Sequence, residues 1–139
     1  HARDKGIRCL LEPLQRVETN ILLDAKGVRR MLDEIGAENM DVALDTVAMA
    51  CGNDSVADYF RLFGPRVGHV QVVDGNPAGH LVWGDGSLPL GRYMEELAAH
   101  GYAGKLTFEP FGNGTYALDP MTAWRRCLDG IKPYLQANG

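Results

Sequence analysis

The stretch Met40-Asp41-Val42-Ala43-Leu44-Asp45 is a short, largely apolar run that ends in a carboxylate. A run of this length predicts a β-strand, and a longer segment with apolar residues at helical spacing follows it. The same alternation of a short apolar run and a helical segment recurs on both sides. The sequence therefore predicts four βα units built around a parallel sheet.

The predicted elements share two signals, Val, Ile and Leu in the strands and capping residues at the helix ends. The predicted strands are Ile7–Glu12, Met40–Asp45, Val67–Val73 and Lys105–Glu109. The predicted helices begin near Asp24, near Asp54 or Ser55, at Leu90 and at Asp119-Pro120, and the first three end at Gly36, Gly64 and Gly101. The expected buried faces are Val28, Met31, Leu32 and Ile35 on the first helix and Met121, Trp124, Leu128, Ile131 and Leu135 on the last.

Four βα units make half of an eight-stranded TIM-type (β/α) barrel, a fold that takes about 250 residues. The chain has 139 residues, and we expect residues 1–139 to form one such half barrel. Alone it would leave two unpaired strand edges, so the other four units are expected from a missing segment or from another chain. A self-sufficient flavodoxin-like open sheet is the alternative, although no Gly-rich phosphate loop follows the first strand.

Composition narrows the classes of partner. The formal net charge is -4 and the basic residues are scattered, which argues against nucleic acid as a partner. No apolar run approaches the roughly 20 residues of a membrane span, and no targeting segment is visible, so a cytoplasmic location is expected. Cys9, Cys51 and Cys127 lack CxxC spacing, and we expect buried thiols rather than a disulfide or a zinc site.

Side chains with oxygen donors stand at the ends of the predicted strands. Glu12, Asp45 and Glu109 close three of them, and Gln71 lies within the remaining one. Function collects at the carboxyl ends of parallel strands, and buried carboxylates are costly unless they are paired or bound to a cation. These donors are therefore expected to meet around one divalent ion. The alternative is that Glu12 and Asp45 serve as helix caps or ion-pair partners at the rim.

The expected donor set contains three carboxylates and one amide. Such a set suits a hard cation better than zinc. We expect Mn²⁺, with Mg²⁺ or Co²⁺ as alternatives.

Three segments resemble the xylose-isomerase-like barrel superfamily of sugar isomerases and epimerases, and within it the fructoselysine 3-epimerases. Leu11-Glu12-Pro13-Leu14 with Glu18-Thr19-Asn20 resembles the first ligand strand and its loop. His69-Val70-Gln71-Val72-Val73-Asp74 resembles an HxHxxD segment, and His80-Leu81-Val82-Trp83-Gly84-Asp85-Gly86 resembles an HxxxGxG loop. The resemblance covers almost the whole chain and implies the C-terminal half of such a barrel.

The resemblance implies roles for five residues, and the position of His80 in its loop suggests a role for a sixth. It places Glu12, Asp45, Gln71 and Glu109 on the metal-ligand positions, with Glu12 and Glu109 also as the catalytic base and acid. It places Glu18 on a glutamate that contacts substrate hydroxyls. His80, in the HxxxGxG-like loop, is expected either to contact a substrate hydroxyl or to stabilise its loop. His69 is expected to be structural.

The chain departs from the family pattern at two positions. Gln71 stands where ketose 3-epimerases usually have histidine, whereas hydroxypyruvate isomerase usually has glutamine at this position. Ala48 stands where many ketose 3-epimerases have a substrate-binding histidine. The metal site is expected to survive these departures, while the contact to one end of the substrate must differ.

The expected activity is a metal-dependent ketose 3-epimerase, with fructoselysine-type sugars as the candidate substrates. Removal and return of a proton beside a ketone would pass through an enediolate stabilised by the metal. A hydroxypyruvate-type or aldose–ketose isomerase is the first alternative, and a non-catalytic sugar-binding or structural half barrel is the second. The expected partners are a small sugar and either a second copy of the chain or the missing N-terminal half.

Overall fold

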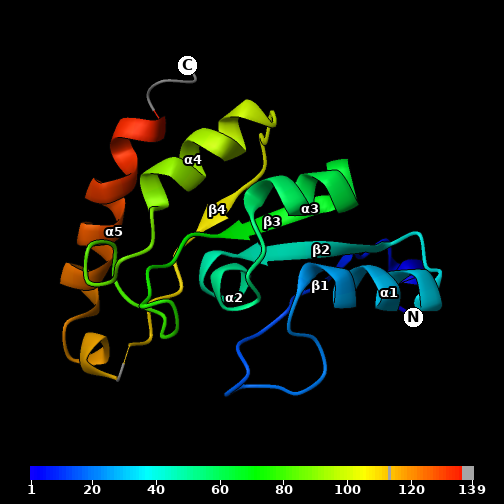
Figure 1. The fold of residues 1–139 in the computed structure, drawn as a ribbon, viewed down its shortest axis with the longest axis horizontal. Helices are drawn as coiled ribbons and strands as arrows, with labels where there is room; N and C mark the ends of the chain where they lie inside the picture. Colours follow the sequence, from blue (N-terminus) through cyan, green and yellow to red (C-terminus); the bar gives the residue numbers. More distant parts are fainter. Residues whose placement is uncertain (113, 136–139) are drawn as a thin grey trace.

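The computed structural model describes residues 1–112 and 114–135, and these contain one parallel four-stranded sheet (Figure 1). The strands are β1 (Cys9–Leu11), β2 (Met40–Asp45), β3 (Val67–Gln71) and β4 (Leu106–Thr107), and they lie side by side in chain order. The predicted bounds of β2 are confirmed, whereas the other three strands are shorter than predicted. The sheet alternates with helices, as expected for half of a TIM barrel.

Five α-helices connect or follow the strands: α1 (Ala25–Ile35), α2 (Thr46–Cys51), α3 (Val56–Phe63), α4 (Leu90–Ala99) and α5 (Pro120–Leu135). Short 3₁₀ turns occupy Arg3–Lys5, Gly64–Arg66 and Thr115–Leu118. The predicted caps are confirmed, since Asp24 accepts the N–H of Gly27 and Ser55 forms a capping box with Asp58. The sequence did not predict α2, which begins directly where β2 ends.

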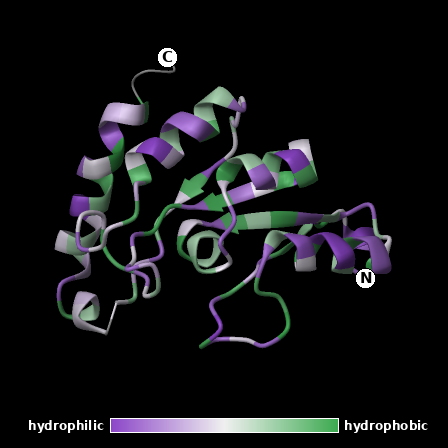
Figure 2. Cartoon of the chain, in the orientation of Figure 1, coloured by the Kyte–Doolittle hydropathy of each residue, from purple (hydrophilic) through white to green (hydrophobic). Residues whose placement is uncertain are grey.

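The main core lies between the sheet and the helices (Figure 2). Val42 and Leu44 of β2 and Val70 of β3 are fully buried in it together with apolar side chains of α1, α3 and α4. Because side chains alternate along a strand, Asp41 and Asp45 lie on the opposite face of β2 from Val42 and Leu44. That opposite face would be the interior of a complete barrel.

The predicted buried stripe on α5 is partly wrong. Its buried residues are Ala123, Cys127 and Ile131, whereas Met121, Trp124 and Leu135 are each about half exposed. The cause is Trp83, whose indole lies so close to Gly130 that a Cβ there would come within 2.5 Å of the ring. This contact turns the 123–127–131 face inward. On α1, Ile35 is likewise exposed rather than buried.

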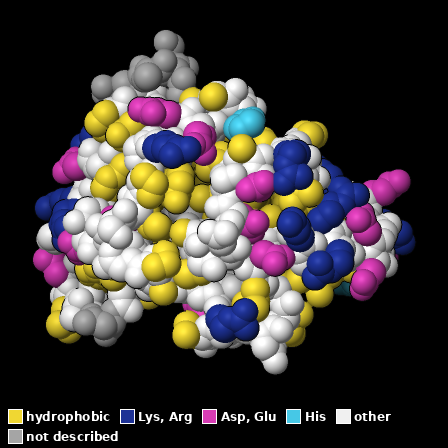
Figure 3. Space-filling model, in the orientation of Figure 1, with side chains coloured by type: hydrophobic (Ala, Val, Ile, Leu, Met, Phe, Trp, Pro, Cys, Tyr) yellow, Lys and Arg dark blue, Asp and Glu magenta, His cyan; other side chains and the backbone are white. Residues whose placement is uncertain are grey.

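The three cysteines are free thiols, as predicted, but they differ in burial. Cys127 is buried and Cys9 is partly buried, whereas Cys51 is exposed, which corrects the expectation that all three are buried. Within the described residues, no helix has the length and apolarity that crossing a membrane requires. Acidic and basic side chains are interspersed over the face that carries α1 and α3 (Figure 3).

Candidate metal centre

Asp45 ends β2 and begins α2, and its two oxygens have different surroundings. Oδ1 accepts the N–H groups of Val47 at 2.8 Å and Ala48 at 2.7 Å, so the expected cap role is real for this oxygen. Oδ2 is buried and has no hydrogen-bond partner within normal range. Thr46 fixes the junction, because its hydroxyl donates to the carbonyl of Val73 and accepts that residue's N–H.

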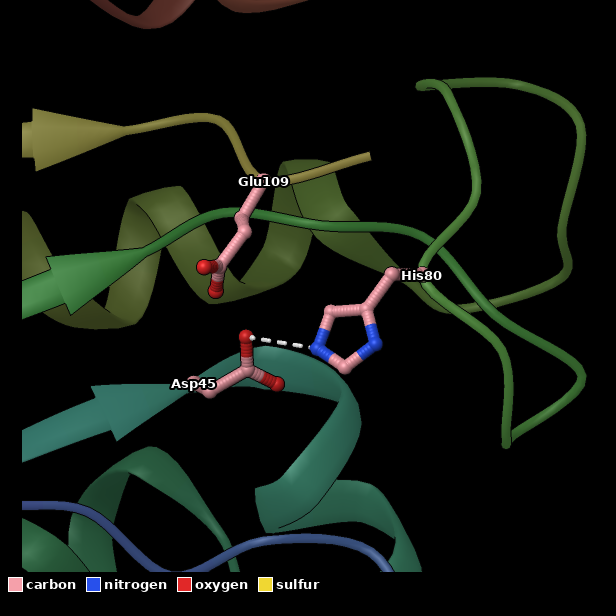
Figure 4. A group of neighbouring side chains, drawn as sticks. All are labelled: Asp45, His80 and Glu109. Carbon is pink, nitrogen blue, oxygen red and sulfur yellow. Dashed lines mark ion pairs between the residues drawn. The ribbon is translucent and has the colours of Figure 1, made fainter. Parts of the chain in front are cut away.

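Three side chains from different segments converge beyond the ends of the strands (Figure 4). Asp45 comes from β2, Glu109 from the segment after β4, and His80 from the loop after β3. One ligand-type atom of each lies within 4.8 Å of the others. The Nε2 of His80 is 3.5 Å from Oδ2 of Asp45, and both side chains are almost fully buried. These distances are compatible with a shared cation.

Gln71 ends β3 directly beside Asp45 in the parallel register. Its Oε1 is buried and has no hydrogen-bond partner. Among the described residues, three buried side-chain oxygens lack a partner, and two of them belong to Asp45 and Gln71 at this place. Buried polar atoms are normally satisfied, so two neighbouring orphan acceptors indicate a missing electropositive group.

Glu12, just after β1, joins the same electrostatic cluster. Burial and then the charges of Asp45 and Glu109 raise the pKa of Glu12 to about 7. Burial is also the main reason that the pKa of Glu109 is raised, and Asp45 adds to it. The cluster therefore holds more negative charge than its surroundings neutralise, which a divalent cation would correct.

His80 is held in place by a loop built around Asp74. The buried carboxylate of Asp74 accepts N–H groups from Gly75, Gly84, Gly86 and Leu88. Gly86 must be glycine here, because a Cβ would lie 2.3 Å from Oδ1 of Asp74. On the other side, the carbonyl of His80 accepts the N–H groups of Phe111 and Gly112, so two loops meet at this residue.

The protonation of His80 responds to opposing influences. Burial is the largest and lowers its pKa, but the nearby carboxylate of Asp45, followed by Glu18 and Glu109, outweighs it and raises the pKa. The ring also lies against Phe111, with 5.2 Å between the centroids. His69 lies outside this cluster and contacts Thr107 on β4, in keeping with the predicted structural role.

Glu18 lies in the exposed loop after β1, and a buried neighbour holds it. One oxygen of Glu18 accepts the backbone N–H of Gln15 at 3.0 Å and lies 3.3 Å from the Nε2 of that residue. Gln15 also contacts His80, and the sequence did not predict a role for Gln15 in the site. No local pattern marks Gln15, because its partners are 64 and 65 residues away along the chain.

The residues present fit a hard divalent cation. Asp45 and Glu109 lie close together with His80, and the charge of Glu12 interacts with theirs, although Glu12 is not part of that close group. The buried Oδ2 of Asp45 and Oε1 of Gln71 have no hydrogen-bond partner. Such donors suit Mn²⁺ or Mg²⁺. The predicted ligand set and the observed cluster thus share Asp45 and Glu109, with His80 as an additional neighbour.

Comparison with known proteins assigns the chain to a family. Residues 1–134 match the xylose isomerase-like TIM barrel family. The chain belongs to that family. Fructoselysine 3-epimerase of Escherichia coli O157:H7 is 29% identical over 97% of this chain and 49% of its own length. D-psicose 3-epimerase of Agrobacterium fabrum is 32% identical over 93% of this chain and 44% of its own length.

Solved structures of the family agree with the fold. A D-psicose 3-epimerase from Clostridium cellulolyticum H10, crystallised with D-tagatose, has a TM-score of 0.77 and 26% identity. The match covers 97% of this chain and 50% of that protein. The chain therefore spans about half the length of the relatives it matches, which confirms the predicted half barrel.

Proposed function

We propose that this chain supplies the metal-binding half of a ketose 3-epimerase that acts on a small sugar or sugar derivative of the fructoselysine or psicose kind. One observation carries the proposal. Oxygen donors at the ends of neighbouring strands, two of them without partners, gather beside a buried histidine in a chain related to 3-epimerases. In our proposal the half is the C-terminal one, and a preceding segment or a second copy completes the barrel.

Glu12, Asp45, Gln71 and Glu109 would hold the divalent ion, with Mn²⁺ the first choice. The bound ion would supply Lewis-acid polarisation of the substrate carbonyl and offset the negative charge that develops on proton removal. Glu12 and Glu109 follow the two outermost strands, β1 and β4, so their carboxylates can flank a sugar placed between them. One carboxylate removes the proton beside the carbonyl, and the other returns a proton to the opposite face.

Glu18 and His80 would contact substrate hydroxyl oxygens. Both come from loops at the carboxyl ends of strands, where substrates of parallel α/β barrels bind. Ala48 is buried at the start of α2 and donates its N–H to Asp45, so this position contributes backbone rather than a side chain to the site. The contacts to one end of the sugar must therefore come from elsewhere in the assembled barrel.

The test is solvent exchange. The assembled protein, with whatever completes its barrel, is incubated with Mn²⁺ and a panel of ketoses in deuterated water, and proton NMR follows wash-in beside the carbonyl. We expect exchange at C3 and formation of the C3 epimer with at least one ketose. Glu109→Gln should lower the rate by about 10²- to 10⁴-fold, the usual contribution of a general acid or base. The matched control is Glu95→Gln, an exposed carboxylate on α4, and should not change the rate.

Two outcomes would count against this assignment. Absence of exchange with every sugar would favour a non-catalytic sugar-binding or structural half barrel. Exchange accompanied by an aldose product would favour an aldose–ketose or hydroxypyruvate-type isomerase. The glutamine at position 71 supports this second candidate, because it resembles the pattern of hydroxypyruvate isomerase.

A further inference from the structure

Gln15 joins the two loops that carry Glu18 and His80. It lies after β1 and is only 5% exposed, although its neighbours Arg16 and Val17 are exposed. Its side chain reaches across to Gly79 and His80 in the loop after β3. A buried amide that bridges two site loops needs a fixed orientation, and its partners define that orientation.

The hydrogen-bond partner of the Gln15 side-chain oxygen, Oε1, determines the orientation of the amide group. The backbone N–H of Gly79 can only donate, and it lies 2.9 Å from the Oε1 of Gln15. The NH₂ group must therefore face the other side, where His80 Nδ1 is 3.1 Å away and a Glu18 oxygen is 3.3 Å away. Both hydrogens and the oxygen of this amide are thus used.

The same reasoning fixes the hydrogen on His80. An amide NH₂ cannot accept, so Nδ1 of His80 accepts from Gln15 and carries no hydrogen. The hydrogen of the neutral ring is then on Nε2, which lies 3.5 Å from Oδ2 of Asp45.

We propose that Gln15 is a positioning residue that keeps His80 in the tautomer whose Nε2–H faces the metal centre. His80 then serves as a hydrogen-bond donor to a substrate oxygen and does not ligate the ion, because a ligating nitrogen needs a free lone pair. This inference rests on the proposed function for its catalytic meaning. The tautomer itself follows from the hydrogen bonds alone.

The amide also couples two substrate contacts. Its second hydrogen is directed at Glu18, and the backbone N–H of Gln15 binds the same carboxylate oxygen. Loss of the amide would therefore release His80 and loosen Glu18 together. The metal-binding oxygens of Asp45, Gln71 and Glu109 make no hydrogen bond to Gln15 and should keep their places.

The direct test is long-range ¹H–¹⁵N NMR of the imidazole nitrogens in the assembled, metal-free protein. The pH is set above the range in which ordinary histidine titrates. We expect an unprotonated Nδ1 and a protonated Nε2 for His80. In Gln15→Glu the new carboxylate can still accept the N–H of Gly79, but it has no hydrogen to donate to His80. The ring must then donate to the carboxylate, so the imidazole hydrogen of His80 should move from Nε2 to Nδ1. His69, which contacts Thr107 instead, is the internal control and should not change.

Kinetics provide the second readout. Gln15→Met keeps the length of the side chain but not its hydrogen bonds, and kcat/KM should fall about 10- to 100-fold, as for other outer-shell partners. In a His80→Ala background the same substitution should cost less, because the part that acts through the ring is gone and only the part that acts through Glu18 remains. Equal costs in the two backgrounds would overturn the positioning role.

The two proposals can fail separately. A hydrogen on Nδ1 of His80 in the unmodified protein would overturn the inference even if the protein epimerises sugars and even if the variants fail to fold. Absence of solvent exchange in the unmodified protein would overturn the proposed function and leave the tautomer result standing.

Discussion

Asp41 and Asp45 lie on the same strand and the same face, one near each end of β2, and both are almost fully buried. Asp41 is neutralised by the protein, because Arg8 and Arg66 both pair with it. Among the described residues no arginine or lysine pairs with Asp45, whose Oδ2 has His80 as its ion-pair partner and Glu109 close by. The protein itself thus neutralises the buried carboxylate at the amino end of β2, whereas the one at the carboxyl end has no arginine or lysine partner within the part of the chain that the structure describes, as the proposed cation site requires.

Replacing each of the two aspartates by asparagine tests the difference between the two ends, and we expect the larger effect on activity at the carboxyl end. Asp45→Asn keeps an oxygen for capping α2 but removes a negative ligand, so turnover should fall by about 10²- to 10³-fold, the size of a lost electrostatic contact. Mn²⁺ at 100 times its dissociation constant should stabilise the unmodified protein by about 2.7 kcal/mol. Thermal unfolding with and without Mn²⁺ measures this gain, which Asp45→Asn should lose.

Asp41→Asn is the matched control for that experiment. It should keep both the turnover and the stabilisation by Mn²⁺, since Asp41 lies at the opposite end of the strand. A cation response that survives Asp45→Asn, or that disappears with Asp41→Asn, would contradict the division between the two ends.

At the amino end, the same substitution should act on stability. Asp41→Asn removes the negative charge that pairs with Arg8 and Arg66, and a hydrogen bond to a charged group contributes about 1.5–3 kcal/mol. Urea unfolding of the metal-free protein measures the loss. Asp45→Asn should cost less under the same conditions, because its cap survives and an unneutralised charge is removed. A larger loss of stability for Asp45→Asn would contradict the expectation that Asp41, and not Asp45, stabilises the metal-free fold.

The sequence revealed the carboxyl end better than the amino end. Residues that end apolar runs, such as Asp45 and Glu109, are visible one strand at a time, and parallel pairing brings them together. The pairing of Asp41 was invisible, since Arg8 and Arg66 are scattered along the chain and only the register of β1, β2 and β3 unites them.

The errors of prediction have the same origin in long-range contacts. The buried face of α5 depends on Trp83, which packs against Gly130 from a loop more than 40 residues earlier. The role of Gln15 depends on a loop 64 residues later. Strand lengths were overstated because apolar residues such as Val72 and Val73 are buried beyond the end of β3 without belonging to it. Local pattern predicts elements, whereas such contacts decide which of their faces are used.

Asp85 is a third aspartate, which is paired like Asp41 but exposed to solvent. It accepts from Arg126 on α5 and from the hydroxyl of Tyr116, and the hydrogen bonds to Arg126 and then Tyr116 lower its pKa. A lowered pKa in the folded state means that the stabilisation is present above the ordinary aspartate range. It is lost as the pH falls through the folded pKa, so the change occurs below about pH 4.

We therefore expect Asp85→Asn to cost about 0.2–1 kcal/mol near neutral pH, as exposed ion pairs do, and less as the pH falls below about 4. Denaturant unfolding of both proteins across this pH range measures the difference. A loss of unfolding free energy as large as that of Asp41→Asn, or a loss independent of pH, would contradict the expected dependence of an ion pair's contribution on burial. A small cost that fades with acid would show instead that burial, added to pairing, accounts for the larger cost at Asp41.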